Sequence, residues 1–534
     1  MATPFAAALP RLLANSPLRH PTFRQFYAGS IGVAIGYTMQ ATVAAWLMAT
    51  LTPSALMVAL VQTASTAPSM LFGLFAGALA DIVERRRIIL VTQGVLLVAA
   101  TVLGLAALVG VIGPASLLLL TFVIGGAFAF YMPAQQASIN ELVGRADLSR
   151  AVALGAVAFN VARAIGPALA GALAAWIGTG SALVASAVFF VPMIFAVRRW
   201  KPQPILPGVP ETVLSGVLSG LRFARHSSAM RAFIVRNFAF AVAASSFWAL
   251  LPVIARDQLG LGAGGFGLLS AAFGSGAIVG ALAIPGQLAR QPLNTIVRSG
   301  MFLWISAITL LAVTPYLSLA LVGAFAAGTA WVTVFASLSA GTQSAAPAWV
   351  RARAVGMNLV AVQASLAVGS AVWGAFASGA GTREALGLSA ASMAVLYLLI
   401  RRVKVEMGRE ADVTPSLHLP DLAPAVTPLP DDGPVLIQIE YHIEPPRWPQ
   451  FLRAVQAVGR VRRRNGAASW RVYRDIGEEG RFVERYVLTS WSEYVRLRSR
   501  MTISDRDLIA QVEALQRADT PIRVSRLIGV GDGA

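Results

Sequence analysis

Two stretches that lie 203 positions apart resemble each other: RAVALGAVAFNVARAIGPALAG at Arg150–Gly171 and RAVGMNLVAVQASLAVGSAVWG at Arg353–Gly374. Nine of the 22 aligned pairs are identical. The same shift aligns residues 77–80 with residues 280–283, and both of these segments read Gly-Ala-Leu-Ala. Two separate segments agree on one offset, so the sequence predicts two similar halves with the same orientation. If the chain crosses a membrane, such halves are related by an axis along the membrane normal.

Each half contains six apolar runs. A helix that spans a bilayer needs about 20 mostly apolar residues. Such runs lie at approximately 26–50, 54–80, 88–111, 115–138, 151–175, 180–197, 230–255, 264–286, 296–314, 317–340, 354–378 and 385–400. Only 13% of the residues are charged, whereas soluble domains carry roughly 25%. We therefore predict an all-α polytopic membrane protein of twelve transmembrane helices in two six-helix bundles, surrounded by lipid.

Arginine and lysine are concentrated in alternate connections between these runs. If the N-terminus is cytoplasmic, the cytoplasmic connections hold the clusters Arg85–Arg87, Arg198–Lys201 and Arg401–Lys404, while the opposite side holds little beyond Arg256 and Arg383. This asymmetry predicts a multi-pass protein of the cell membrane with both termini in the cytoplasm. A net charge of +18 can also indicate nucleic-acid binding. Topology explains the placement of these cations better, so we expect no nucleic-acid partner.

The acidic residues divide the chain, because 18 of the 25 Asp and Glu residues follow Lys404. The predicted domains are an N-terminal bundle at 1–198, a cytoplasmic loop at 199–229, a C-terminal bundle at 230–404, a linker at 405–433 and a cytoplasmic α+β domain at 434–530.

The pattern of residues 434–530, which we call the tail, predicts alternating strands and helices. Residues 435–443 alternate like a strand, 446–464 form a basic amphipathic helix, 469–475 and 481–491 form a strand pair, helical residues extend to about 517, and 522–528 close the domain. The order βαββαβ predicts a ferredoxin-like α+β domain. It resembles the dimeric α/β-barrel domains related to antibiotic-biosynthesis monooxygenases, which implies a homodimer through this domain. His442 and Trp470 leave an enzymatic alternative open, although a lone histidine beside a strand is usually structural.

The short connection after the second run reads GALADIVERRR at Gly77–Arg87. Asp81 would stand at a helix C-terminus, where the macrodipole disfavours an anion and a partner is needed. Arg85 and Arg86 would hold this loop on the cytoplasmic side. The alternative interpretation is a simple charged loop that sets topology.

This loop resembles the GxLaDrxGrk signature of the major facilitator superfamily, although Ile82 and Glu84 depart from it. Further segments are similar to the enterobactin-exporter-like branch, the transmembrane secretion effectors. They lie at residues 23–26, 133–137, 160–171 and 251–262. The resemblance covers about residues 15–404. It implies alternating access around a central cavity and export of a small molecule.

Gly166 and Pro167 form a pair inside the fifth run. Proline removes a backbone donor and can kink the helix, and glycine permits close helix approach. In the superfamily, a similar pair in this span accompanies export, so we expect a conformational role. Ordinary tight packing is the alternative.

Arg163 is the only ionisable residue that the sequence places deep in a span, roughly 18 Å from the start of its helix. A charge at such depth is costly and indicates a functional site. It could bind an anionic group of the substrate or take part in coupling, or it could be structural. The other polar residues expected to line a cavity are Asn160, Gln363, Gln40 and Gln62.

Several mechanisms lack sequence support. No Asp or Glu lies inside a predicted span, which leaves proton coupling open, and no GxxxxGK[ST] loop indicates direct use of ATP. Cysteine is absent, and we expect no metal, no cofactor and no enzymatic activity. The predicted function is secondary active export of a siderophore-, drug- or metabolite-like molecule. The alternatives are an importer of the same fold and a membrane-anchored sensor or enzyme that acts through the tail.

Overall fold

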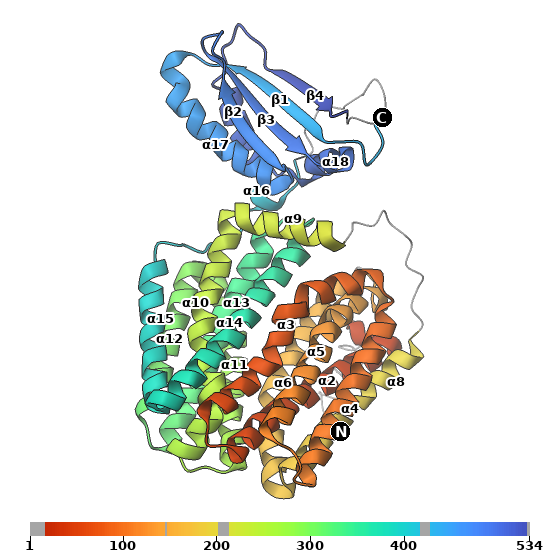
Figure 1. Cartoon of the computed structure of the whole chain (residues 1–534), viewed down its shortest axis with the longest axis vertical. Coiled ribbons are helices and arrows are strands. Elements are labelled where there is room, and N and C mark those ends of the chain that lie inside the picture. Colours follow the sequence, from red (N-terminus) through yellow and green to blue (C-terminus); the bar gives the residue numbers. More distant parts are fainter. Residues whose placement is uncertain (1–15, 145–146, 201–212, 417–427, 531–534) are drawn as a thin grey trace, which may run out of the picture. The chain divides into compact units, whose positions relative to one another are not determined.

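The structure is a computed structural model that describes residues 16–144, 147–200, 213–416 and 428–530. Figure 1 labels its helices and strands. The contacts divide the chain into two compact units. Unit 1 comprises residues 1–213, 235–338 and 358–404, and unit 2 comprises residues 214–234, 339–357 and 405–534. The predicted domain boundaries follow the order of segments along the chain and remain a prediction.

The first half of unit 1 begins with a 3₁₀ turn, η1 (Pro17–Arg19), and continues as a bundle. Its helices are α2 (Pro21–Leu51), α3 (Ala55–Ile82), α4 (Arg85–Leu108), α5 (Pro114–Leu142), α6 (Leu148–Ile177), α7 (Thr179–Val188) and α8 (Val191–Arg199). Proline occupies the first turn of α2 and of α5, where its missing N–H costs nothing.

The second half follows the same order. Its helices are α10 (Ser228–Val253), extended by the π-helical η2 (Ile254–Gln258), then α11 (Ala263–Arg290), α12 (Leu293–Val313), α13 (Leu317–Ala345), α14 (Arg351–Ala380) and α15 (Thr382–Ile400).

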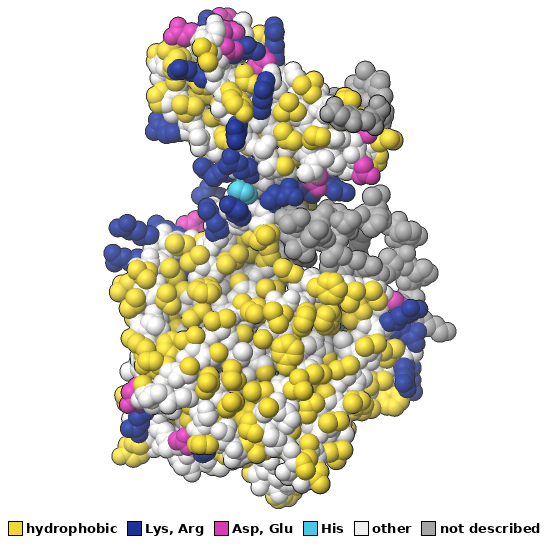
Figure 2. All heavy atoms as spheres, viewed as in Figure 1, with side chains coloured by type: hydrophobic (Ala, Val, Ile, Leu, Met, Phe, Trp, Pro, Cys, Tyr) yellow, Lys and Arg dark blue, Asp and Glu magenta, His cyan; other side chains and the backbone are white. Residues whose placement is uncertain are grey.

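Eleven spans of the described chain are long and apolar enough to cross a bilayer. The twelfth expected span is α6, whose apolar part is Ile165–Ile177. In Figure 2, hydrophobic side chains cover the middle of the visible helical surface, and Lys and Arg gather near its ends. The prediction of twelve helices in two bundles is confirmed.

The sixth span is interrupted, which the sequence did not predict. It consists of α7 and α8, with the break at Phe189 and Phe190. Pro192 lies in the first turn of α8 and cannot continue the hydrogen bonding of α7. The backbone at the break packs on α2, because a Cβ at Gly32 would lie 2.7 Å from the Phe189 carbonyl oxygen. The interrupted span therefore packs closely against α2 at Gly29, Gly32 and Gly36.

The internal repeat is visible in helix packing. Gly166 of α6 packs on α2, where an added Cβ would lie 2.9 Å from the Thr38 Cβ. Its repeat mate Gly369 of α14 packs on α10 in the same way, where an added Cβ would lie 3.2 Å from the Ser245 Cβ. Equivalent glycines thus serve equivalent helix pairs in the two halves.

Unit 2 contains α9 (Val213–His226) and an α+β domain. The domain consists of β1 (Val435–His442), η3 (Pro445–Arg447), α17 (Trp448–Asn465), β2 (Ser469–Arg474), β3 (Arg481–Leu488), α18 (Trp491–Arg500), α19 (Ile503–Glu513) and β4 (Arg523–Ile528). A short helix, α16 (Glu410–Val413), precedes it.

The four strands form an antiparallel sheet in the order β2-β3-β1-β4. Strands β1 and β2 are joined through α17 with β3 between them, as in a split βαβ fold. Alternate residues of β1 are buried against the helices. The prediction of a ferredoxin-like domain is confirmed. One detail was wrong: the helical stretch expected to run to about residue 517 is two helices, because Thr502 caps the start of α19.

Candidate functional site

The two bundles of unit 1 meet along two helix pairs, which we call the seam. In the first pair, α6 crosses α11 at Gly171 and Gly267. A Cβ added at Gly171 would lie 2.5 Å from the Gly267 Cα, and one added at Gly267 would lie 2.6 Å from the Gly171 Cα. Only glycine permits this backbone approach.

In the second pair, α3 and α14 run antiparallel. The Leu56 amide donates to the Ser378 hydroxyl at 2.9 Å, and the Thr63 hydroxyl donates to the Ala367 carbonyl at 2.8 Å. Gly374 packs against α3 between these bonds, and an added Cβ would lie 3.2 Å from the Leu56 Cα. Gly374 is the repeat mate of Gly171, so one repeated glycine serves both halves of the seam.

At one end of the seam, Arg256 of η2, between α10 and α11, forms hydrogen bonds to the end of α2. Its Nη1 donates to the carbonyl oxygen of Ala49 and, at 2.9 Å, to that of Thr52. Its Nη2 donates to Asp257 at 2.8 Å. The two carbonyls end α2, where the helix dipole is negative and attracts a cation. Arg256 therefore links the second bundle to a helix end of the first.

We expect Arg256→Gln to loosen this end of the seam. Loss of charge-assisted hydrogen bonds costs about 1–2 kcal/mol, which shifts a two-state population roughly 5–30-fold. The chain has no cysteine, so a single Ala55→Cys substitution at the buried start of α3 reports opening by its reaction with a membrane-impermeant thiol reagent. Arg383→Gln, which alters an exposed arginine in the first turn of α15, is the matched control. Equal labelling of both variants would remove Arg256 from this role.

Of the three glutamines predicted to line a cavity, two lie on helices of the seam. Gln62 on α3 and Gln363 on α14 are half-buried, on the two helices joined by the Thr63 bond. Gln40 on α2 is fully buried, and its amide nitrogen has no hydrogen-bond partner among the described residues. The structure therefore brings two of them onto facing helices and places the third inside the first bundle.

Arg163 and Asn160 lie in α6, and Asp81 lies in the last turn of α3. The side chains of these three residues lie outside the described part of the structure. Their roles remain predictions.

The arginines of the Gly77–Arg87 segment fasten helix ends within the first bundle. Arg85 pairs with Glu141 at the end of α5 and donates to the Ala137 carbonyl at 3.3 Å. Arg86 donates to the carbonyls of Val197 and Arg198, at 3.1 and 3.0 Å, and so caps the C-terminus of α8. A Cβ at Gly77 would meet no atom within 4 Å.

Gly166 and Pro167 are buried inside α6. The Thr38 hydroxyl of α2 donates to the Ala162 carbonyl at 3.2 Å, one turn before this pair. The Pro167 carbonyl faces α11, because a Cβ at Gly267 would lie 3.2 Å from its oxygen. The pair therefore contacts both α2 of its own bundle and α11 of the other.

Sequence reasoning missed Arg236, a second arginine inside a span. It is 2% exposed on α10. Its Nε and Nη2 donate to the Val403 carbonyl at 3.1 and 2.9 Å, and Nη2 also donates to Asn294 at 3.2 Å. It binds the chain just after α15, again at the negative end of a helix. Arg236 lies near the end of a predicted span, where the long side chain of an arginine usually reaches water. Its sequence position therefore did not indicate that it is buried.

Aromatic rings pack together in the second bundle. Phe247 stacks on Phe273 at 4.9 Å, Phe240 meets Trp304 edge-on at 5.3 Å, and Trp331 lies 4.4 Å from Phe335. The Trp304 indole N–H is buried and has no hydrogen-bond partner in the described chain. These aromatic side chains therefore pack the core of the second bundle.

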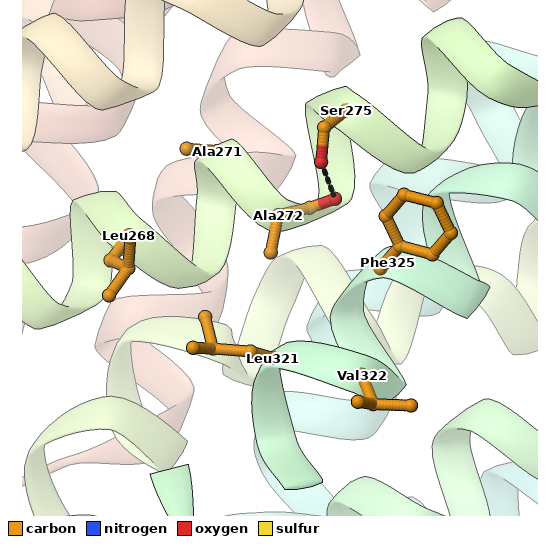
Figure 3. A pocket seen from close by; sticks show the side chains of 7 residues that line it. All are labelled: Leu268, Ala271, Ala272, Ser275, Leu321, Val322 and Phe325. Atoms are coloured by element: carbon orange, nitrogen blue, oxygen red, sulfur yellow. Dashed lines mark hydrogen bonds between the residues drawn. The ribbon is translucent and has the colours of Figure 1, made fainter. Parts of the chain in front are cut away.

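A groove on the second bundle lies between α11 and α13, as Figure 3 shows. Its walls are apolar, with Leu268, Val322 and Phe325 substantially exposed. Its one polar side chain, Ser275, donates to the Ala272 carbonyl at 2.8 Å. The groove lies within one bundle, and its exposed walls are apolar. It therefore has the character of a lipid-facing surface.

The α+β domain buries a charged network. Glu484 is fully buried and accepts hydrogen bonds from the Tyr441 hydroxyl and the Trp470 indole N–H, both at 2.9 Å. Arg462 approaches it at 3.4 Å and lies over the Tyr486 ring. Burial raises the pKa of Tyr441 and keeps its hydroxyl protonated as a donor. Trp470 is therefore a structural residue of this core.

Twelve helices in two repeated bundles are the fold of the major facilitator superfamily, and solved transporters share this fold. The crystal structure of a bacterial homologue of the human lysosomal transporter Spinster, inward-facing and unoccupied, gives a TM-score of 0.59 at 15% identity, over 72% of this chain and 98% of that one. The nucleoside transporter NupG gives 0.58 at 14% identity, over 72% and 98%.

The chain belongs to the transmembrane secretion effector family, whose family model matches residues 13–532. It is 26% identical to the multidrug efflux pump Tap of Mycolicibacterium fortuitum, over 73% of this chain and 96% of Tap. It is 27% identical to the enterobactin exporter EntS of Escherichia coli O1:K1, over 75% and 96%. The protein is therefore a multi-pass membrane transporter and not an enzyme.

Proposed function

We propose that this transporter exports a small molecule from the cytoplasm across the cell membrane by alternating access between its two bundles. The seam carries the proposal. Repeat-related Gly171 and Gly374 bring the halves into backbone contact on both sides of the pseudo-symmetry axis. Two bundles whose closest contacts run along two narrow strips can rock about them. Similarity to the multidrug efflux pump Tap and the enterobactin exporter EntS supports export, and we propose a siderophore-, drug- or metabolite-like substrate.

The positions of the seam contacts favour an inward-facing state. They extend from the Leu56–Ser378 bond, next to the first turn of α3, to the packing of Gly73 on Val360, just past the helix midpoints. Arg256 fastens the same end. The Arg-rich connections lie at the opposite ends of these helices, which the positive-inside rule assigns to the cytoplasm. We therefore infer closure toward the outside, with both termini and the α+β domain in the cytoplasm.

Transport assays test the function directly. Cells that express the protein should accumulate less of a transported drug or siderophore than cells without it, and inverted vesicles should take that compound up. A protonophore should abolish the difference if transport is proton-coupled. Arg163→Gln should lower transport several-fold without changing protein yield, because an arginine within the length of a span is costly unless it functions. Net uptake by intact cells would reverse the direction, and normal transport by the variant would remove Arg163 from the site.

The α+β domain is proposed to join two copies of the protein. All six residues of β4 are exposed, including Val524 and Leu527. Leu436 of β1 pairs in register with Leu527 and Val487, which gives one sheet face an apolar patch. Exposed apolar strand surface is a common partner site. The molar mass of the full-length protein in detergent should be that of two chains. Deletion of residues 405–534 should yield one chain and spare part of the efflux, whereas complete loss would favour the tail as the active part.

A further inference from the structure

Unit 2 gathers four arginines around His226, and we call this group the arginine cluster. Arg222 and Arg225 belong to α9, Arg231 to the first turn of α10, and Arg463 to α17. The pKa of His226 is lowered, first by burial and then by the positive charges of these four guanidinium groups. Elements α9, α10 and α17 of unit 2 therefore each contribute positive charge near His226, and the Arg222–Gly466 bond joins two of them.

Within the described part of the chain, no carboxylate pairs with the cluster. Residues 213–231 and 448–466 contain no Asp or Glu, and none of the four arginines has a carboxylate within ion-pair distance among the described residues. The neighbours in α17 differ, because Arg462 pairs with Glu484 and Arg464 with Asp505. Several like charges held close together without counter-charges repel one another and favour a bound anion.

Two of the arginines are held in place by backbone carbonyls. Arg463 donates to the Trp470 carbonyl at 3.1 Å and lies over the indole ring at 5.2 Å. Arg222 donates to the Gly466 carbonyl at 2.8 Å. These bonds use only part of each guanidinium, which carries five N–H donors. Arg225 and Arg231 are exposed and remain available to a ligand.

The cluster surrounds the start of a membrane span. The stretch Ser228–Gln258 is long and apolar enough to cross a bilayer. Ser227 caps its first turn by accepting a hydrogen bond from the Met230 amide at 3.3 Å. The N-terminus of a helix adds positive potential from its free amides. A residue at the first turn of a spanning helix lies at the depth of lipid headgroups.

We propose that the arginine cluster binds the phosphate of an anionic phospholipid headgroup, such as phosphatidylglycerol. Guanidinium groups bind phosphate oxygens in pairs, and a basic pocket at the end of a span is suited to anionic lipids. A free phosphate ion shares this chemistry, but the position at the start of α10 favours the lipid. The inference goes beyond the proposed function and does not depend on substrate or direction.

Lipid binding by the full-length protein in detergent tests the proposal. Dioleoylphosphatidylglycerol, dioleoylphosphatidylcholine and inorganic phosphate are titrated separately, and the occupancy of the tightest lipid site is measured by native mass spectrometry. At about 1 kcal/mol per basic residue near the surface, Arg225→Gln with Arg231→Gln should weaken phosphatidylglycerol binding roughly 30-fold. The double lysine variant, which keeps both charges, should bind within about threefold of the unaltered protein.

The matched control is Arg401→Gln with Arg402→Gln, which removes the same charge from exposed positions just after α15. It should leave the tightest lipid site unchanged. If the glutamine pair at 225 and 231 binds phosphatidylglycerol as tightly as the control, the proposal is overturned. It is also overturned if phosphatidylcholine binds the site equally well, or if inorganic phosphate displaces the lipid at equal concentration, because the cluster would then hold a free anion.

Discussion

Replacing Gly171 with alanine is expected to reduce export about tenfold or more. The added Cβ would lie 2.5 Å from the Gly267 Cα and 3.0 Å from the Ala263 carbonyl oxygen. These are backbone atoms that cannot rotate away, so α6 and α11 must separate. Overpacking of this kind costs about 1–3 kcal/mol, and 1.4 kcal/mol corresponds to a tenfold change in a population or a rate. The cost falls on the state in which the seam is closed.

Gly155→Ala is the matched control, because it lies in the same helix and an added Cβ there would meet nothing within 4 Å. Alanine also favours the helix over glycine, so export should stay at the original level. Efflux is measured together with protein yield and the elution profile in detergent, which separates lost transport from failed folding. Gly374→Ala should behave like the Gly171 variant. Unchanged export by both variants would show that the seam does not limit transport.

Replacing Glu484 with alanine is expected to unfold the α+β domain or to destabilise it by about 3–5 kcal/mol, the usual cost of leaving a buried charge without its partner. Arg462 would keep its charge at 6% exposure, and the Tyr441 and Trp470 donors would lose their acceptor. Since whole domains are stable by about 5–15 kcal/mol, the loss is large. Hydrogen exchange across residues 434–530 of the full-length protein should rise sharply.

Glu478→Ala provides the control for this change. Its carboxylate is about half exposed and pairs with His442 and Arg481, so the expected cost is at most about 1 kcal/mol. Glu484→Gln should fall between the two, because the amide oxygen still accepts a hydrogen bond while the charge is lost. If the alanine variant at 484 exchanges no faster than the control, the buried network does not hold the domain together.

The sequence predicted part of the candidate site but not how its parts meet. Gly166, Pro167 and the repeat were found because glycine and proline mark backbone features wherever they occur. The sequence marks Gln62 and Gln363 as polar residues inside spans, and they lie on facing helices. It marks Gln40 in the same way, yet Gln40 lies inside one bundle. Polarity alone cannot separate these cases, because it does not tell which face of a helix meets a partner.

The partners of Arg256 also could not be predicted from the sequence. The sequence shows Arg256 only as a cation on the side of the membrane that carries few, yet it reaches the end of α2, more than 200 positions earlier in the chain. Its partners are backbone carbonyls, which leave no mark in the sequence. Arg236 binds the end of α15 in the same manner. Helix ends become binding partners only when folding brings them close.

The sequence by itself determined that lipid surrounds the helical part, where the spans lie, and that the two halves repeat. It also determined the order of strands and helices along the C-terminal domain. These depend on bilayer thickness and on residue periodicity, which are properties of each segment alone. Tertiary structure decided that Gly171 meets Gly267, that Arg256 joins the two bundles, that the sixth span is broken, and that arginines from three elements place positive charge near His226. Such contacts depend on which helix faces meet, and that is fixed only when all the segments pack together.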